Sequence, residues 1–412
     1  MGIVYRKISC AITNDGLPAK QGRHPQEKDL GIVSNAAIVH DSRMGILWVG
    51  KDGSLPKEFK SKKFKHISCK GLTAYPGLVD PHTHLVFDGD RSLEFSLRMR
   101  GASYQEIATA GGGIITSMKA TRGSTKARLS ELVQQRLKIA HQFGVRLIEA
   151  KSGYGLTARS EINCLEAIRD GAAAFKKIAV QATCLSAHAV PPEFRERSDE
   201  YIELILKDIL PIVKKRGLAR FVDAFCDPGF FTIDQSRRLL SAAKNMGFDL
   251  RLHGEELANT GAAELASELA AYSVDHLLKI SEKGIKRLAA SSTVGILLPG
   301  TSFYLREPPA PARKLIDAGV CVALATDFNP GTCPTQNLPF IGTLAAVQLG
   351  MTTPEIIAAI TWNGAKSLGE EAHFGAIIPG FIGEPVFTEG DHPSALFYKM
   401  AGAGLVFPKS LA

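Results

Sequence analysis

The feature that most constrains the fold is a regular alternation of two kinds of segment that begins at about residue 72. Short apolar or β-branched runs end in polar residues, and longer segments with helical periodicity separate them. The runs occupy 72–80, 145–151, 178–188, 221–227, 248–256, 272–277, 294–299 and 320–327. The helical patterns cover 126–143, 159–177, 201–216, 233–246, 262–271 and 282–290. Eight strand–helix repeats of this length predict an α/β fold, a (β/α)8 TIM-like barrel over residues 72–368.

The two ends of the chain have a different pattern. Residues 1–71 contain alternating segments such as 36–41 and 45–49, followed by a turn at 50–53. Residues 369–412 are rich in Gly, Pro and Phe and again look strand-like. We therefore predict a small β-sandwich domain that is built from both termini and flanks the barrel.

Size and composition favour an enzyme of the cytoplasm. The 412 residues are 45% hydrophobic, which is enough for a large barrel and a smaller domain. The sequence has no apolar run near the roughly 20 residues that cross a bilayer, and it begins without a secretory core. The seven cysteines are scattered without a Cys-x-x-Cys pair, as is typical of buried thiols in a reducing compartment.

The net charge of +8 raises the possibility of nucleic-acid binding. The densest basic stretch, 57–66, has only two aromatic residues, and no nucleic-acid-binding motif accompanies it. We interpret it as a solvated face and expect no nucleic-acid or membrane partner. A mildly basic enzyme suits an anionic small-molecule substrate. The sequence does not determine the oligomeric state, and a homodimer is one option.

Histidines and acids gather where the predicted barrel strands end, which is where barrel enzymes carry their catalytic groups. His82 and His84 are two residues apart on extended backbone, so both imidazoles can face one ion. Asp327 ends the last strand, which neighbours the first in a closed barrel, and His253 ends the fifth. Three imidazoles and a carboxylate suit one divalent ion, zinc or iron, and leave a position for water. Such an ion lowers the pKa of its water toward ~7.

Two further residues near these strand ends have the chemistry of acid–base catalysis. Glu256 follows His253 by three residues, so its carboxylate can shuttle a proton without binding the metal. His276 can donate a hydrogen bond to the oxyanion that forms on attack, and Asp327 can orient the attacking water. We interpret Glu255 as a solvated glutamate at a helix start. Each residue alone has a structural explanation, but their convergence at strand ends favours catalysis.

These residues resemble the amidohydrolase superfamily. The resemblance rests on Pro76-Gly-Leu-Val-Asp-Pro-His-Thr-His84, on His253-x-x-Glu256, on Asp275-His276 and on Asp327. The fourth strand, 221–227, has no lysine to carbamylate, so the chain resembles the branch with one metal ion. We interpret Lys151, at the end of the second strand, as a structural or substrate-loop lysine.

Within the superfamily the chain resembles the imidazolonepropionases from about residue 74 to 368. The stretches that carry this resemblance are Gly89–Arg91 with Glu94-Phe95, 110–114, 149–155, 187–191 and 326–332. The resemblance implies hydrolytic ring opening of 4-imidazolone-5-propanoate to N-formimidoyl-L-glutamate in histidine degradation. It implies one metal ion held by His82, His84, His253 and Asp327. It also implies substrate or product contacts from Arg91, Tyr154, His188, Glu256, Asn329, Gly331 and Thr332.

The glycines at 111–113 lack the Gly-Lys-Ser/Thr of a phosphate loop, so we expect a flexible substrate loop there. The resemblance fades at 381–387, which leaves the register of the C-terminal strand open.

Two other functions stay open. A nucleobase deaminase of the same superfamily would use the same metal and acid–base set. Arg91 and the loop of Tyr154 argue against it, because a neutral base needs no anchor for a carboxylate. A non-catalytic scaffold descended from such a barrel would be expected to lose metal ligands, and none is lost here.

Overall fold

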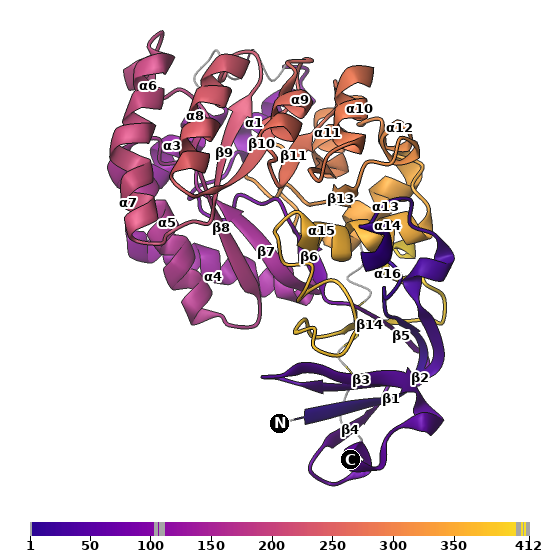
Figure 1. The fold of residues 1–412 in the computed structure, drawn as a ribbon. Coiled ribbons are helices and arrows are strands. Elements are labelled where there is room, and N and C mark those ends of the chain that lie inside the picture. Colours follow the sequence, from indigo (N-terminus) through magenta and orange to yellow (C-terminus); the bar gives the residue numbers. More distant parts are fainter. Residues whose placement is uncertain (1, 103–105, 107–111, 401–404, 407, 409–412) are drawn as a thin grey trace.

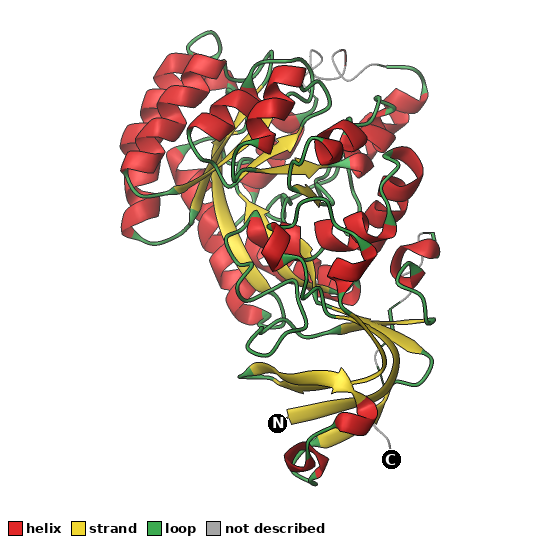
Figure 2. Ribbon diagram, turned by 45° about the vertical axis from the view of Figure 1, so that its right-hand side comes forward, coloured by secondary structure: helices red, strands yellow, loops and turns green. Residues whose placement is uncertain are grey.

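The computed structural model describes residues 2–102, 106, 112–400, 405, 406 and 408. Within that part of the chain, eight parallel strands follow one another around a barrel in chain order, with helices outside them (Figures 1 and 2). The strands are β6 (Leu78–Asp80), β7 (Val145–Lys151), β8 (Ala179–Ala187), β9 (Phe221–Cys226), β10 (Asp249–Gly254), β11 (Ser273–His276), β12 (Val294–Leu297) and β13 (Val322–Leu324). The predicted (β/α)8 barrel is confirmed.

The barrel closes just beyond the ends of β6 and β13, at the residues that carry the chemistry. Thr83 and Phe328 form a parallel bridge. The backbone N–H of His84 donates to the carbonyl of Phe328 at 2.8 Å, and that of Asp327 donates to the carbonyl of His82 at 3.0 Å. The first and last predicted strands are therefore neighbours, as the sequence indicated.

Helices surround the strands and begin at identifiable caps. Four helices have a side-chain hydroxyl that accepts a backbone N–H of the first turn, namely α4 (Lys126–Gln142) at Thr125, α5 (Ala158–Ala174) at Thr157, α8 (Ile233–Asn245) at Thr232 and α10 (Glu282–Ala289) at Ser281. The predicted helix at 201–216 is α6 and α7 joined by a π-helical turn, Ile205–Ile209. The helices are α1 (Ser92–Met99), α3 (Ile114–Gly123), α4 (Lys126–Gln142), α5 (Ala158–Ala174), α6 (Ser198–Leu204), α7 (Leu210–Lys215), α8 (Ile233–Asn245), α9 (Ala262–Glu268), α10 (Glu282–Ala289), α11 (Pro299–Leu305), α12 (Ala312–Asp317), α13 (Leu338–Gln348), α14 (Thr353–Ala359), α15 (Trp362–Lys366) and α16 (Ala395–Tyr398).

A second, mixed sheet lies beside the barrel and draws on both ends of the chain (Figure 1). Its strands in the described residues are β1 (Gly2–Ile12), β2 (Ile32–Asp41), β3 (Gly45–Lys51), β4 (Lys65–Ser68), β5 (Leu72–Tyr75) and β14 (Val386–Glu389). β14 pairs antiparallel with β5, Val386 opposite Tyr75, which settles the register of the C-terminal strand. The run at 72–80 is divided, since β5 joins this sheet and β6 joins the barrel.

No helix in the described ranges is long and apolar enough to cross a membrane. The predicted loop at 111–113 lies partly outside the described residues, because 111 is not among them. From Ile114 onward the chain is helix α3.

Candidate active site

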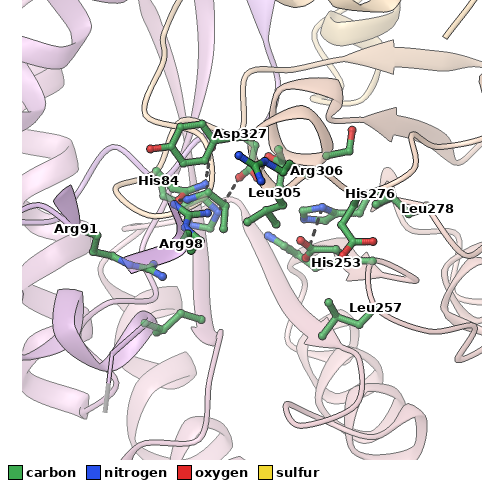
Figure 3. A pocket seen from close by; sticks show the side chains of 18 of the residues that line it. His84, Arg91, Arg98, His253, Leu257, His276, Leu278, Leu305, Arg306 and Asp327 are labelled. Carbon is green, nitrogen blue, oxygen red and sulfur yellow. Dashed lines mark hydrogen bonds and ion pairs between the residues drawn. The ribbon is translucent and has the colours of Figure 1, made fainter. Parts of the chain in front are cut away.

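The predicted metal ligands meet at the carboxyl end of the barrel strands. Among the described residues, ligand atoms of His82, His84 and Asp327 lie within 4.8 Å of one another, and so do those of His82, His253 and His276. Asp327 Oδ1 is 3.4 Å from Nε2 of both His82 and His84. His82 therefore stands at the centre of the cluster, and His276 lies close enough to be a further ligand. Figure 3 shows His84, His253, His276 and Asp327 around the cavity.

The hydrogen bonding and the protonation of the imidazole nitrogens in this cluster fit a metal ion. Nε2 of His82 and Nε2 of His253 are buried and have no hydrogen-bond partner among the described residues. Burial lowers the pKa of His84 to about 4 and also lowers that of His253, which keeps these imidazoles in the neutral, metal-binding form. At His82 burial and Lys151 lower the pKa, but Asp275 outweighs them and raises it to about 9. The surroundings of His82 therefore favour a positive charge.

Two buried carboxylates hold the other nitrogens of these rings. Asp275 Oδ2 lies 2.6 Å from His82 Nδ1, and Asp223 Oδ2 lies 2.9 Å from His253 Nδ1. Carboxylates in this position set the tautomer and orientation of metal-binding histidines. Lys151 lies between them, with Nζ 2.8 Å from Asp223 Oδ2 and 3.8 Å from Asp275 Oδ2.

Lys151 and Arg251 balance the negative charge beneath the cluster. Both are fully buried. Lys151 Nζ donates to Glu149 Oε1 at 2.7 Å, and Arg251 lies 3.3 Å from the same oxygen. Arg251 also donates to the carbonyls of Pro81 and Ser367. Of the two interpretations of Lys151, its buried contacts favour the structural one, because it does not line the cavity.

Glu256 and His276 face each other beside the cluster. Glu256 Oε2 is 3.6 Å from His276 Nδ1. Burial, followed by the charges of Asp327 and Asp227, raises the pKa of Glu256 to about 8. Burial lowers the pKa of His276 to about 3. A carboxyl group with a raised pKa beside a neutral imidazole can hold and release a proton near neutral pH.

The interpretation of Glu255 as a solvated residue at a helix start is wrong. The side chain is fully buried, and α9 begins only at Ala262. The backbone of Glu255 has φ +60°, and its carboxylate accepts a hydrogen bond from Asn259. Burial, with Glu264 nearby, raises its pKa to about 7. Glu256 lines the cavity and Glu255 does not.

A cavity of about 580 Å³ opens over the cluster. The structure brings most of the predicted substrate contacts into its wall. They are Arg91, Tyr154, His188, Glu256, Asn329 and Thr332. Tyr154 and His188 lie edge to face with ring centroids 5.2 Å apart, and His188 stacks on His84 at 4.9 Å. Gly331, the other predicted contact, does not line the cavity.

Arg91 is buried at the start of α1 and paired with an acid. Its Nε donates to Glu94 at 2.8 Å, and Glu94 also accepts the backbone N–H of Gly113. A Cβ on Gly331 would lie 2.0 Å from Nη1 of Arg91, so the missing side chain at 331 makes room for the guanidinium. In Figure 3 the guanidinium of Arg91 points toward the cavity.

The side-chain amide of Asn329 makes its hydrogen bonds within its own loop. Its Oδ1 accepts the backbone N–H groups of Gly331 and Thr332, and its Nδ2 donates to the Asp327 carbonyl and the Thr332 hydroxyl. This side chain shapes the loop that follows Asp327.

One wall of the cavity was missed by the sequence reasoning. It is formed by α11 and by Arg98 on α1. The Arg98 guanidinium lies 4.8 Å from the Tyr304 ring, and its Nη2 donates to the Gly331 carbonyl. The run at 294–299 gave no sign that a helix begins at Pro299. The helical spacing of Phe95, Arg98 and Met99 was the available signal for α1.

The fold and the buried histidine–aspartate cluster define an amidohydrolase, and residues 73–406 match the family described as Amidohydrolase family. The chain is 43% identical over 404 residues to an imidazolonepropionase of Bdellovibrio bacteriovorus, covering 98% of this chain and 94% of that one. It is 45% identical over 380 residues to that of Geobacillus kaustophilus, covering 92% and 89%. The chain therefore belongs to the imidazolonepropionase family.

Solved structures with much lower identity share the fold. An atrazine chlorohydrolase of Arthrobacter aurescens TC1 in complex with zinc has a TM-score of 0.71 at 16% identity, covering 98% of this chain and 92% of that chain. A guanine deaminase of E. coli has a TM-score of 0.70 at 14% identity, covering 94% and 89%.

Proposed function

We propose that this chain hydrolyses a ring carbon–nitrogen bond of 4-imidazolone-5-propanoate and releases N-formimidoyl-L-glutamate, a step of histidine degradation. The single observation that carries the proposal is the cavity in which a buried arginine and a histidine–aspartate cluster face one space. Identity of 43–45% to imidazolonepropionases over more than nine tenths of the chain supports the same reaction.

His82, His84, His253 and Asp327 would hold one metal ion. The buried Nε2 atoms of His82 and His253, which make no hydrogen bond among the described residues, support this assignment, as do the carboxylates that orient both rings. Zinc and iron both suit imidazole and carboxylate ligands. When bound, the ion supplies Lewis acidity, which activates water and polarises the ring carbonyl.

The acid–base chemistry falls to Glu256. Its carboxylate lines the cavity, and a proton on one of its oxygens can pass to the leaving ring nitrogen. His276 faces the same space and can donate to the oxygen that gains charge during attack. Asp327 can orient the attacking water through the oxygen that does not accept from Thr301.

The propionate group of the substrate would be bound at the wall of the cavity that carries Arg91. The Arg91 guanidinium offers the planar pair of donors that a carboxylate needs. Tyr154 and His188 line the cavity beside His84, with ring centroids 5.8 Å and 4.9 Å from that of His84, and a flat ring can pack against them. Thr332 completes the polar edge of the space. The seven cysteines are all buried free thiols, which suits a reducing cytoplasm.

The direct test is turnover of imidazolone propionate beside guanine, adenine and cytosine derivatives, with product identified by mass. We expect water addition to the imidazolone and formation of N-formimidoyl-L-glutamate. Ammonia release from a nucleobase, with no imidazolone turnover, would establish the deaminase alternative. An inactive chain that binds no metal would establish the scaffold.

A further inference from the structure

The loop that carries Tyr154 leaves β7 in an unusual backbone shape. Gly153 has φ +112°, and Leu156, which has a side chain, has φ +53°. Glycine adopts a positive φ freely, but at a residue with a side chain such as Leu156 it persists only where the surrounding structure holds it. The residues that hold this loop therefore determine where Tyr154 lies in the cavity wall.

Glu161, in the first turn of α5, holds the N–H groups of this loop. Its Oε1 accepts from the backbone N–H of Gly153 at 3.2 Å, Gly155 at 2.7 Å and Leu156 at 2.9 Å. Its Oε2 accepts from the Ser186 hydroxyl at 3.1 Å. Glu161 is fully buried and does not line the cavity, so it cannot touch substrate.

Arg122, on α3, holds the carbonyls of the same loop. Its Nε donates to the Gly155 carbonyl at 2.7 Å, and its Nη2 donates to that of Leu156 at 3.2 Å. A third carbonyl of the loop, that of Gly153, lies 3.0 Å from His188 Nδ1. The shape of the loop therefore determines the position of two cavity-lining rings, Tyr154 and His188.

We propose that Glu161 is a positioning residue for substrate binding, acting through the loop of Tyr154. The proposal rests on the proposed function for the identity of the substrate. Loss of the carboxylate would leave three backbone N–H groups buried without an acceptor, so the loop would change its shape. The metal cluster has no contact with Glu161 and should keep its ion.

The test compares Glu161→Ala with Glu161→Gln. The glutamine keeps Oε1 for the three N–H groups, and its NH2 can donate to Ser186, whose hydroxyl also accepts. We expect alanine to raise KM by ~10-fold or more with a smaller change in kcat and unchanged metal content, and glutamine to restore most of the loss.

The matched control is Glu166→Ala, on the same helix, where a buried glutamate pairs with Lys126 and Arg216. It should lower the Tm and leave KM unchanged. An unchanged KM in Glu161→Ala, an equal change in the control, or no rescue by glutamine would overturn the proposal.

Hydrogen exchange on the wild-type protein tests the same claim without substrate and without a variant. The amides of Gly153, Gly155 and Leu156 should exchange slowly despite their place in a loop. Exchange at the rate of exposed loops would overturn the proposal. If wild-type protein shows this protection but does not turn over imidazolone propionate, the proposed function fails and the role of Glu161 stands.

A second carboxylate holds the loop of Glu256 by independent contacts. Asp227, which follows β9, is buried. Its Oδ2 accepts the backbone N–H of Glu256 at 2.9 Å, and its Oδ1 accepts those of Leu257 at 3.2 Å and Ala258 at 3.1 Å. We infer that Asp227 is a positioning residue for proton transfer, which rests on the proposed role of Glu256.

Asparagine cannot replace this aspartate as glutamine can replace Glu161. Both oxygens of Asp227 accept backbone N–H groups, so one of them would face the NH2 of an asparagine, donor against donor. We expect Asp227→Asn to lower kcat by ~10-fold or more, with KM and metal content nearly unchanged.

Asp249→Asn is the matched control, because Asp249 begins the neighbouring strand and forms a half-buried ion pair with Arg220 outside the cavity. It should leave kcat unchanged. A normal kcat in Asp227→Asn, or an equal fall in both variants, would refute the assignment. If the variant does not fold, wild-type exchange decides, since fast exchange at the amides of 256–258 would also refute it.

Discussion

The carboxyl end of the barrel and the small mixed sheet both contain non-glycine residues with positive φ, but in opposite surroundings. In the sheet, Lys7 (φ +56°) and Asn35 (φ +46°) are exposed beside an irregularity in the pairing of β1 and β2. In the barrel, Glu255 (φ +60°), His276 (φ +81°) and Asp327 (φ +52°) are buried. The exposed residues with positive φ in the sheet do not line the cavity over the cluster. At the barrel end, His276 and Asp327 both have positive φ and both line that cavity.

The two regions also differ in what they bury. The sheet packs apolar side chains such as Ile8, Ile38 and Phe387 against one another. The barrel end buries histidines, carboxylates, Lys151 and Arg251 in a connected set of ion pairs. Buried charges are poor at increasing stability, but they can hold other groups in fixed positions. Changes in the barrel end should therefore alter turnover, and changes in the sheet should alter stability.

The largest effect on turnover among single substitutions is expected at Glu256. Glu256→Gln keeps the shape of the side chain but cannot carry a proton, so kcat should fall ~10²- to 10⁴-fold with metal content unchanged. Steady-state kinetics and elemental analysis give both numbers. Glu255→Gln is the neighbouring control and should cost less than ~10-fold, since it does not line the cavity. Near-normal turnover in Glu256→Gln would remove this residue from the chemistry.

A smaller and more selective effect is expected at Arg91. Lysine cannot reproduce the two-pronged contact to a carboxylate, so Arg91→Lys should lower kcat/KM for imidazolone propionate by ~10- to 100-fold. An imidazolone that lacks the carboxylate should lose much less. Equal losses on the two compounds would mean that Arg91 supports α1 through Glu94, and the anchor would then be sought at Tyr154, His188 or Arg98.

The smallest effect on turnover is expected in the sheet. Phe387 is buried on β14 with its ring 4.8 Å from that of Tyr5. Phe387→Ala should reduce the free energy of unfolding by ~3–5 kcal/mol, as a large-to-small core substitution does. The kcat/KM of the folded protein should stay within about twofold, since neither residue lines the cavity over the histidine–aspartate cluster. Denaturant unfolding and steady-state kinetics on one preparation would measure the free energy of unfolding and kcat/KM. A large loss of kcat/KM would show that the sheet also supports turnover.

The barrel was predictable because its information is local and repeated. Strand runs and helical periodicity gave α4 (126–142 against a predicted 126–143) and α8 (233–245 against 233–246) nearly to the residue. The division of 72–80 between two sheets was not predictable, because β5 pairs with β1 and β14, which are distant in the sequence, and no local pattern encodes that pairing.

The buried histidine–aspartate cluster was predictable for a similar reason, since its residues lie at strand ends that the repeat locates. The environment of each of these residues was not predictable from the sequence. Glu255 and Glu256 are adjacent glutamates in the sequence, and only the turn after β10 buries one and presents the other to the cavity. The roles proposed for Glu161 and Asp227 depend on contacts to backbone N–H groups, which leave no mark in residue type or spacing.

We propose that one metal ion at the histidine–aspartate cluster supports the activity of the barrel end. The most direct test of this proposal is a titration of metal-free protein with zinc or ferrous iron, following bound metal, turnover of imidazolone propionate and circular dichroism together. We expect activity to rise in proportion to occupancy and to saturate at one ion per chain, with the fold present throughout, because the core is large enough to fold without metal. Saturation at two ions per chain, or full activity in protein without metal, would contradict the account.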